Sequence, residues 1–196
     1  MTSTDRLLDQ AVAKARKLKE ENDGLLVVGY GYYELRGPDG SLKQANAFAN
    51  LVTQVGDQYY GERASGIGSP PAQVSGMRLG TGGATAAAKT GAGAAIVTYV
   101  TGSSIAITGG FPTSALNGSS RRIQWQTLWA AGIATASAIS EWVITNEASL
   151  TNVAGTAANT ISRAIDTTTP VNKGASDTLT ITWNHDLLGA GANDQP

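Results

Sequence analysis

The segment Asp177–Trp183 restricts the fold more than any other part of the chain. Its residues alternate in character, so that Leu179, Ile181 and Trp183 share one face and three threonines share the other. A period of two is the spacing of a β-strand that turns one face toward a core and the other outward. The segment therefore predicts a half-buried strand.

Similar short runs of β-branched and aromatic residues recur along the chain, separated by Gly, Asn and Thr turns. They cover residues 25–36, 41–48, 94–100, 105–108, 122–129 and 139–144. Alternation places Trp125 and Trp129 on one face of their run. In the next run it places Trp142 on the face opposite to that of Glu141 and Val143. Many short strands divided by turns indicate an antiparallel sandwich or barrel. We expect a mainly β fold, an antiparallel β-sandwich preceded by an amphipathic helix, a hairpin and a short helix.

The low charge content limits the function classes. Only 15% of residues are charged, against roughly 25% in typical soluble domains. Fourteen basic and fifteen acidic residues give a net charge of −1, which excludes a global field that recruits nucleic acid or an anionic membrane. The chain has no cysteine, so disulfides, thiolate metal sites and thiol catalysis are excluded. A neutral surface rich in glycine suits a protein that partners partly cover.

The distribution of charge predicts the domain organisation. Residues 1–63 hold 9 acidic and 8 basic residues, whereas the longer segment 64–196 holds 6 of each. The Gly, Ser and Pro residues of 64–75 have turn and linker chemistry. We therefore expect an N-terminal helix, hairpin and short helix in 1–63, a linker in 64–75, a β-sandwich in 76–190 and a tail in 191–196.

Residues 4–21 have the apolar spacing of an amphipathic helix, and Asn22-Asp23-Gly24 is a suitable stop. The helix has two interpretations. It packs on its own domain, or it docks on a neighbouring subunit as an arm. In the second case its apolar face is an assembly interface, formed by Leu7, Leu8, Ala11, Val12 and Leu18.

The hairpin and the short helix follow from turn and capping residues. Gly37-Pro38-Asp39-Gly40 is a strong reversal signal between the runs 25–36 and 41–48. Asn50 is a suitable N-cap for a helix from Leu51 to about Glu62, which would bury Leu51, Val55 and Tyr59.

Two segments resemble catalytic or binding motifs only in part. Residues 83–90 approach a phosphate-binding loop, but Ala88 replaces its second glycine and a strand-like run follows in place of a helix. We expect a surface loop there. His185, the single histidine, lies at the end of the last strand with no nucleophile elbow elsewhere in the chain, so we expect a structural histidine.

The remaining polar residues give no acid–base pair or metal site in sequence. Glu141, Glu147, Asp166 and Asp177 are scattered, which leaves glycosidase chemistry unproven. One histidine and no cysteine predict no metal site and no cofactor. The pair Arg121-Arg122 is weak evidence for nucleic-acid binding, because the net charge of the chain is close to zero. Nothing in the sequence requires an enzyme.

Four segments carry a resemblance to a known family. They are Asn50–Gly56, Leu79–Gly82, Arg121–Trp125 and Asn172–Trp183. The chain resembles small virion structural proteins of tailed bacteriophages, in which an LGTG loop and a closing SDxLxIxW strand occur. The resemblance covers about residues 45–188.

The resemblance implies a non-enzymatic protein of the virion, synthesised in a host cytoplasm. The first expectation is a head decoration protein bound to the outer capsid, and the second is a collar, adaptor or tail-fibre component. Its partners would be other virion proteins and further copies of itself, without nucleic acid or membrane. The sequence shows no signal peptide and no apolar run long enough to span a bilayer.

A carbohydrate-binding β-sandwich module is the alternative from another class. It would need tryptophans such as Trp125, Trp129 or Trp142 exposed to stack on sugar rings, whereas the alternation of their segments turns at least two of them inward.

Overall fold

The computed structural model describes residues 27–66, 68–118, 120–147 and 157–187, together with Arg6, Asp9, Gln10 and Ala13. Its strands are β1 (Val27–Arg36), β2 (Leu42–Val52), β3 (Gly76–Gly80), β4 (Ile105–Ala106), β5 (Thr113–Asn117), β6 (Ser120–Trp129), β7 (Ala136–Ile139), β8 (Glu141–Thr145), β9 (Thr160–Ile165), β10 (Val171–Lys173) and β11 (Thr178–Leu187). Helix α2 spans Gln54–Ser65, and two short 3₁₀ turns, η1 and η2, span Gly91–Ala94 and Ala157–Asn159.

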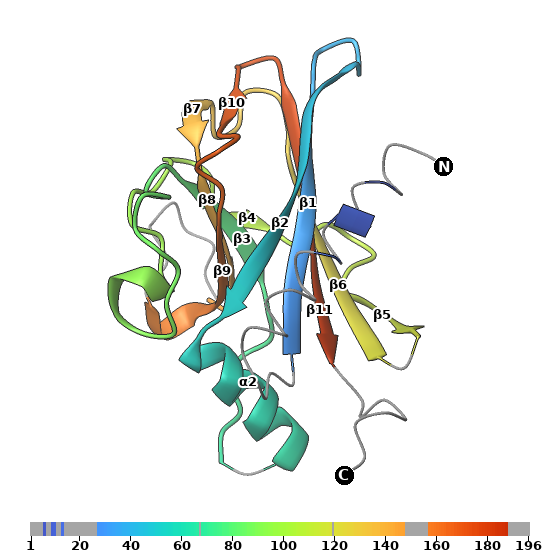
Figure 1. The fold of residues 1–196 in the computed structure, drawn as a ribbon, viewed down its shortest axis with the longest axis vertical. Helices are drawn as coiled ribbons and strands as arrows, with labels where there is room; N and C mark the ends of the chain where they lie inside the picture. The colour runs from blue at the N-terminus through green and yellow to red at the C-terminus, as the bar shows by residue number, and fades with distance from the viewer. Residues whose placement is uncertain are drawn as a thin grey trace.

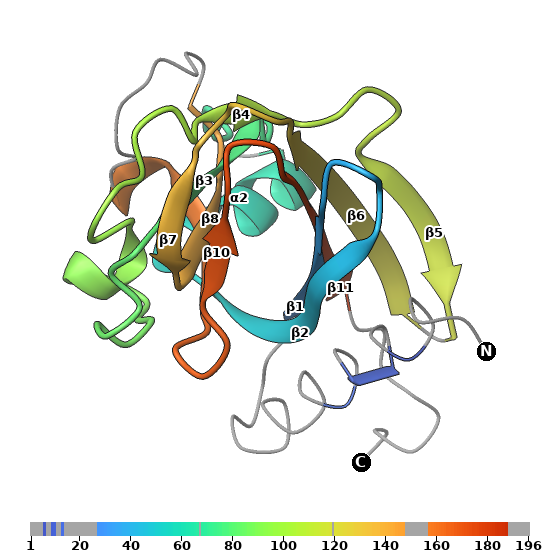
Figure 2. The same cartoon turned by 90° about the horizontal axis from the view of Figure 1, so that it is seen from above.

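Nine strands form one antiparallel sheet in the order β4-β3-β8-β9-β2-β1-β11-β6-β5. The sheet curls until β4, at one end, lies beside β6, and β5 remains outside the closed part (Figures 1 and 2). The backbone N–H of Thr108, just after β4, donates to the carbonyl of Gln126 in β6 at 2.7 Å. The predicted mainly β, antiparallel class is confirmed. A sandwich is not confirmed, because these strands belong to one curled sheet and only β7 and β10 form a separate pair.

The predicted hairpin is confirmed as β1 and β2, which are joined by the turn at 37–40. It lies at the middle of the sheet, because β1 also pairs with β11 along ten residues and β2 pairs with β9. The hairpin, grouped in sequence with residues 1–63, thus shares one sheet with the strands of 76–190.

The concave face of the sheet holds the core. Leu179, Ile181 and Trp183 point into it and are at most 1% exposed, as the alternation of β11 predicts. Aromatic rings fill the centre, where Phe48 lies 5.2 Å from Trp142 and 5.3 Å from Trp183 between ring centroids. Edge and tilted ring contacts of this kind stabilise a core beyond the area that they bury.

Helix α2 packs against strands β2 and β9 (Figure 1). Its N-cap is Thr53, whose hydroxyl accepts from the backbone N–H of Gly56 at 3.1 Å. The predicted start at Leu51 with Asn50 as the cap is therefore wrong, since both residues belong to β2. Gly56 permits the contact with the sheet, because a Cβ there would lie 2.2 Å from the carbonyl oxygen of Ile161.

The segment 81–98 covers the outer face of β8 and β9, where it bonds to Glu141 and Arg163. The strand predicted at 94–100 is wrong, because the chain forms η1 and then extended coil with a single bridge between Tyr99 and Gly80. Because this segment covers the outer face of β8, the strand is buried on both faces, and the predicted alternation of buried and exposed residues is not found. Glu141 and Val143, expected to lie opposite the core, are both 0% exposed.

The predicted N-terminal helix falls mainly outside the described residues. Its expected interface residues, Leu7, Leu8, Ala11, Val12 and Leu18, all lie there. The four residues of this segment that the structure describes are helical and exposed.

Candidate functional site

His185 lies in a buried cluster where α2 meets the inner face of the sheet. Its Nδ1 is 2.5 Å from the hydroxyl of Tyr60 in α2, and its Nε2 is 3.1 Å from Nε1 of Trp183. Nε2 also lies 3.1 Å from the Asn50 amide and 3.3 Å from Ser162 Oγ. These contacts join the helix to three strands of the sheet.

The neighbours of Asn50 fix the orientation of its amide. Its oxygen accepts from Trp183 Nε1 at 3.0 Å and from the backbone N–H of Tyr30 at 2.8 Å. Its Nδ2 then donates to His185 Nε2 at 3.1 Å and to Ser162 Oγ at 2.6 Å. Since Nε2 of the imidazole accepts, the ring carries its proton on Nδ1 and donates it to the hydroxyl on α2.

Burial lowers the pKa of His185 to about 3, so the ring is neutral at pH 7. Ser162 lies within hydrogen-bonding distance of it, and both residues are 0% exposed. A substrate carbonyl cannot contact either group while the fold is intact. The cluster therefore packs α2 onto the sheet, and it offers no nucleophile at the described surface.

Glu141 and Arg163 form a second buried centre, on the outer face of β8 and β9. Both side chains are 0% exposed, and Arg163 Nη2 lies 2.7 Å from Glu141 Oε2. The pair holds the covering segment in place through backbone groups. The carboxylate accepts from the N–H groups of Gly82, Val97 and Thr98, and the guanidinium donates to the carbonyls of Gly82, Thr85, Ala86 and Gly93.

This centre explains the glycines of the Leu79–Gly82 motif. A Cβ at Gly80 would lie 2.4 Å from Glu141 Oε1, and one at Gly82 would lie 2.6 Å from the same atom. Only glycine allows the backbone to approach the carboxylate so closely. The two glycines of the motif are therefore required by the close approach of the backbone to Glu141.

Arg78 and Arg122 are likewise used within the fold. Arg78, 0% exposed, donates to Ser104 Oγ at 2.8 Å and pairs with Glu147. Arg122 pairs with Asp186 at 2.9 Å. Two of the four scattered carboxylates, those of Glu141 and Glu147, thus meet arginines.

Sequence reasoning missed these buried centres, although one signal was present. The strand Gly76–Gly80 places Arg78 between the apolar residues Met77 and Leu79. An arginine inside such a strand is a sign of a buried, paired charge, because an unpaired one would be costly. The cluster around His185 gave no comparable signal, since its members are far apart in sequence.

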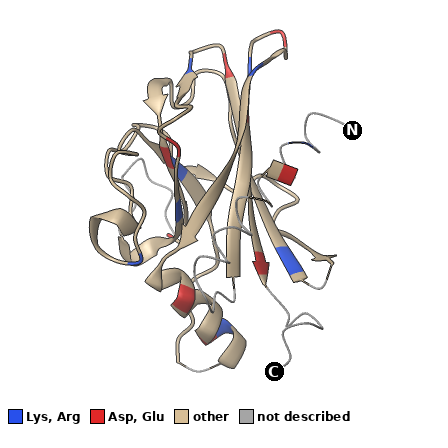
Figure 3. Ribbon diagram, viewed as in Figure 1, with Lys and Arg blue, Asp and Glu red and all other residues tan. Residues whose placement is uncertain are grey.

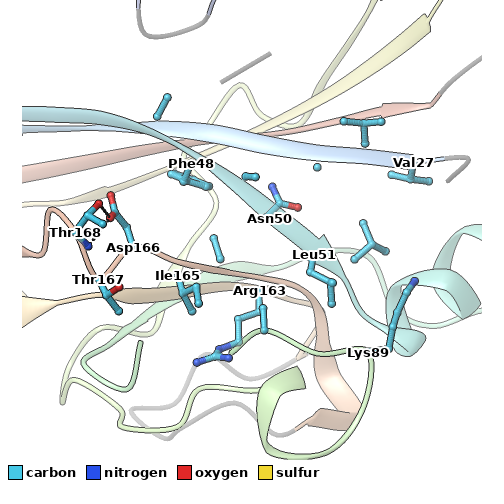
Figure 4. A pocket seen from close by; sticks show the side chains of 17 residues that line it. Val27, Phe48, Asn50, Leu51, Lys89, Arg163, Ile165, Asp166, Thr167 and Thr168 are labelled. Atoms are coloured by element: carbon cyan, nitrogen blue, oxygen red, sulfur yellow. Dashed lines mark hydrogen bonds between the residues drawn. The ribbon is translucent and has the colours of Figure 1, made fainter. Parts of the chain in front are cut away.

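An apolar groove of about 660 Å³ runs along the outer face of β1, β2 and β9 (Figure 4). Ala49, Leu51 and Ile165 are among the residues that line it. Val27 and Lys89 lie at one end, and Asp166 to Thr168 at the other. The groove can hold an apolar side chain or ligand.

The polar groups at the ends of the groove have partners. Lys89 Nζ pairs with Asp57 at 2.7 Å, so its charge is balanced and does not complete the phosphate loop considered for 83–90. Asp166 accepts from Thr168 and Thr169 side chains. Burial alone would raise the pKa of Asp166, but these hydrogen bonds outweigh it and leave the pKa below its ordinary value.

Three further observations bear on the expected sites. In the described part of the chain, no three His, Cys, Asp or Glu side chains are grouped to hold a metal ion. None of its helices has the length and apolar character needed to cross a membrane. Trp125, Trp129 and Trp142 are at most 2% exposed, so they offer no ring face to a sugar.

A scan against protein-family models found no match to the chain, and neither did searches of curated proteins and of solved structures.

Proposed function

We propose that this chain is a structural protein of a phage virion, with a head decoration protein on the outer capsid as the first choice. The proposal rests on the four sequence segments that resemble such proteins. In the structure these segments supply core positions of one sheet and its helix. Leu79, Trp125 and Trp183 are at most 2% exposed, and Gly56 is the residue through which α2 approaches β9.

The use of polar groups inside the fold also favours a structural role. The histidine, both buried arginines and their carboxylate partners are bonded to the protein itself. What remains for partners is an apolar groove and an outer surface with few charges. Such surfaces suit contacts between protein subunits, in which the centre of the interface is depleted of charge.

A collar, adaptor or tail-fibre component remains the second candidate, since the same surfaces serve subunit packing at the neck or tail. The carbohydrate-binding module loses the feature on which it rested, because the three tryptophans that it would use are buried.

Immunogold electron microscopy of intact phage particles, with antibody against this protein, tests the proposal. Label over the whole head supports decoration of the capsid. Label at the neck or tail supports the second candidate. An absence of label, with the same antibody detecting the purified protein on the grid, overturns the virion proposal.

A further inference from the structure

Strand β5 ends the sheet and is open along one edge. Among the described residues it pairs only with β6 (Figure 2). All five of its residues are exposed, and Leu116 is 76% exposed. An open strand edge presents a row of backbone donors and acceptors that another strand can complete.

The strand itself contains none of the charges or prolines that normally protect an edge, although the Arg121 side chain of β6 reaches it and donates from Nε to Ser114 Oγ at 2.8 Å. Residues 90–120 contain no Asp, Glu, Lys or Arg (Figure 3). The nearby proline, Pro112, precedes the strand and so leaves the N–H groups of 113–117 in place. Edges in other proteins carry charges or prolines that prevent pairing between molecules, so this edge is suited to it.

A cleft of about 230 Å³ opens beside β5, between this strand and α2. Ser114 lines it from β5, and Ile123 and Trp125 line it from β6, together with Tyr59 and Val74. Ser114 lies opposite Ile123 in the strand register, so both side chains are on the same face of the sheet. An apolar side chain placed next to Ser114 on that face would enter the cleft.

We propose that β5 pairs antiparallel with β5 of a second copy of this chain, so that the sheet continues across a two-fold axis. Directly opposed residues of an antiparallel pair share a face of the sheet. Because side chains alternate between the two faces along β5, two opposed residues must both have even numbers or both have odd numbers. The register centred on the strand places Ala115 opposite Ala115 of the second copy. Ser114 then lies opposite Leu116 of the second copy, which enters the cleft.

The arrangement satisfies both unusual features of this edge at once. The strand gains backbone partners, and the exposed leucine of each copy gains an apolar site on the other. No charges oppose one another within the paired strands, because β5 has none. The interface is independent of the virion proposal and would exist in the isolated protein.

Cysteine cross-linking of the full-length chain tests the register. The chain has no cysteine, so a disulfide in the variant Ala115→Cys must join two copies. Opposed residues in antiparallel strands have Cα atoms about 4.5 to 5.5 Å apart, within disulfide range. The control Thr113→Cys separates the two cysteines by about 13 Å. We expect a disulfide dimer for Ala115→Cys and none for Thr113→Cys under mild oxidation.

Sedimentation velocity tests the association itself. We expect the unmodified chain to dimerise and Leu116→Lys to weaken dimerisation at least tenfold. The control Leu128→Lys alters a leucine of β6 that is 46% exposed and lies outside β5, so we expect it to dimerise normally. A monomeric unmodified chain overturns the proposal. So does a dimer unaffected by Leu116→Lys, or an Ala115→Cys variant that does not cross-link.

Discussion

The buried histidine makes stability depend on pH, and the upper part of this dependence lies above the range in which carboxylates titrate. Unfolded histidine has an ordinary pKa of 6.5, whereas burial lowers the pKa of folded His185 to about 3. Between these values the unfolded chain binds a proton that the folded chain does not. The free energy of unfolding is therefore highest above pH 6.5 and falls as the pH falls.

The size of the effect follows from the two pKa values. Each pH unit well inside the window costs about 1.4 kcal/mol, so the loss between neutral pH and pH 4.5 is roughly 2 to 3 kcal/mol. The chain has one histidine, and the Asp and Glu side chains of the unfolded chain, with pKa values of about 3.9 and 4.3, are mainly ionised above about pH 5. The slope between pH 6 and 5 therefore reports His185.

Urea unfolding followed by tryptophan fluorescence at a series of pH values measures the slope. We expect about 1.4 kcal/mol per pH unit for the unmodified chain and a flat profile for His185→Gln in the same range. The variant has lower stability at neutral pH, because it loses part of the hydrogen bonding to α2. NMR titration of the folded imidazole is a second measurement. A pKa near 6.5 in the folded protein, or an equal slope in the variant, would refute the reasoning.

Other features of the structure give further expectations. Glu141→Gln leaves the buried Arg163 charge unbalanced and should cost about 3 to 5 kcal/mol in thermal or urea unfolding, whereas Asp57→Asn, in an exposed pair, should cost at most about 1 kcal/mol. Gly56→Ala should lower the melting temperature by several degrees because of its contact with β9. Gly61→Ala, on the open side of the same helix, should stabilise by about 0.5 to 1 kcal/mol. The four tryptophans, at most 2% exposed, should emit at short wavelength and resist iodide quenching, and quenching of the folded protein would contradict the described core.

Pattern reasoning succeeded where the local sequence and the tertiary environment agree. The alternation of β11 identified its inward residues, and the Gly37–Gly40 turn identified the central hairpin. In both cases the information lies within about ten residues of the chain, which is the range over which periodicity and turn chemistry act.

It failed where distant segments decide the environment. Glu141 is buried because residues 81–98 cover β8, a contact that no local pattern encodes. The helix start moved from Leu51 to Gln54 because Thr53 competes with Asn50 as a cap and pairing with β9 extends β2 to Val52. The histidine cluster joins β2, α2, β9 and β11, so the sequence alone could not assemble it.

The position of β11 has a consequence for synthesis of the protein. This strand is the last described element, yet it lies between β1 and β6 near the middle of the sheet. While residues 178–187 are still inside the ribosome, β1 and β6 each lack a neighbour, and the pairing with β1 joins residues about 150 positions apart. Contacts of this range form slowly. The sheet therefore closes only after residues 178–187 have left the ribosome, and a chain that terminates before them is left with two open strand edges inside its own sheet.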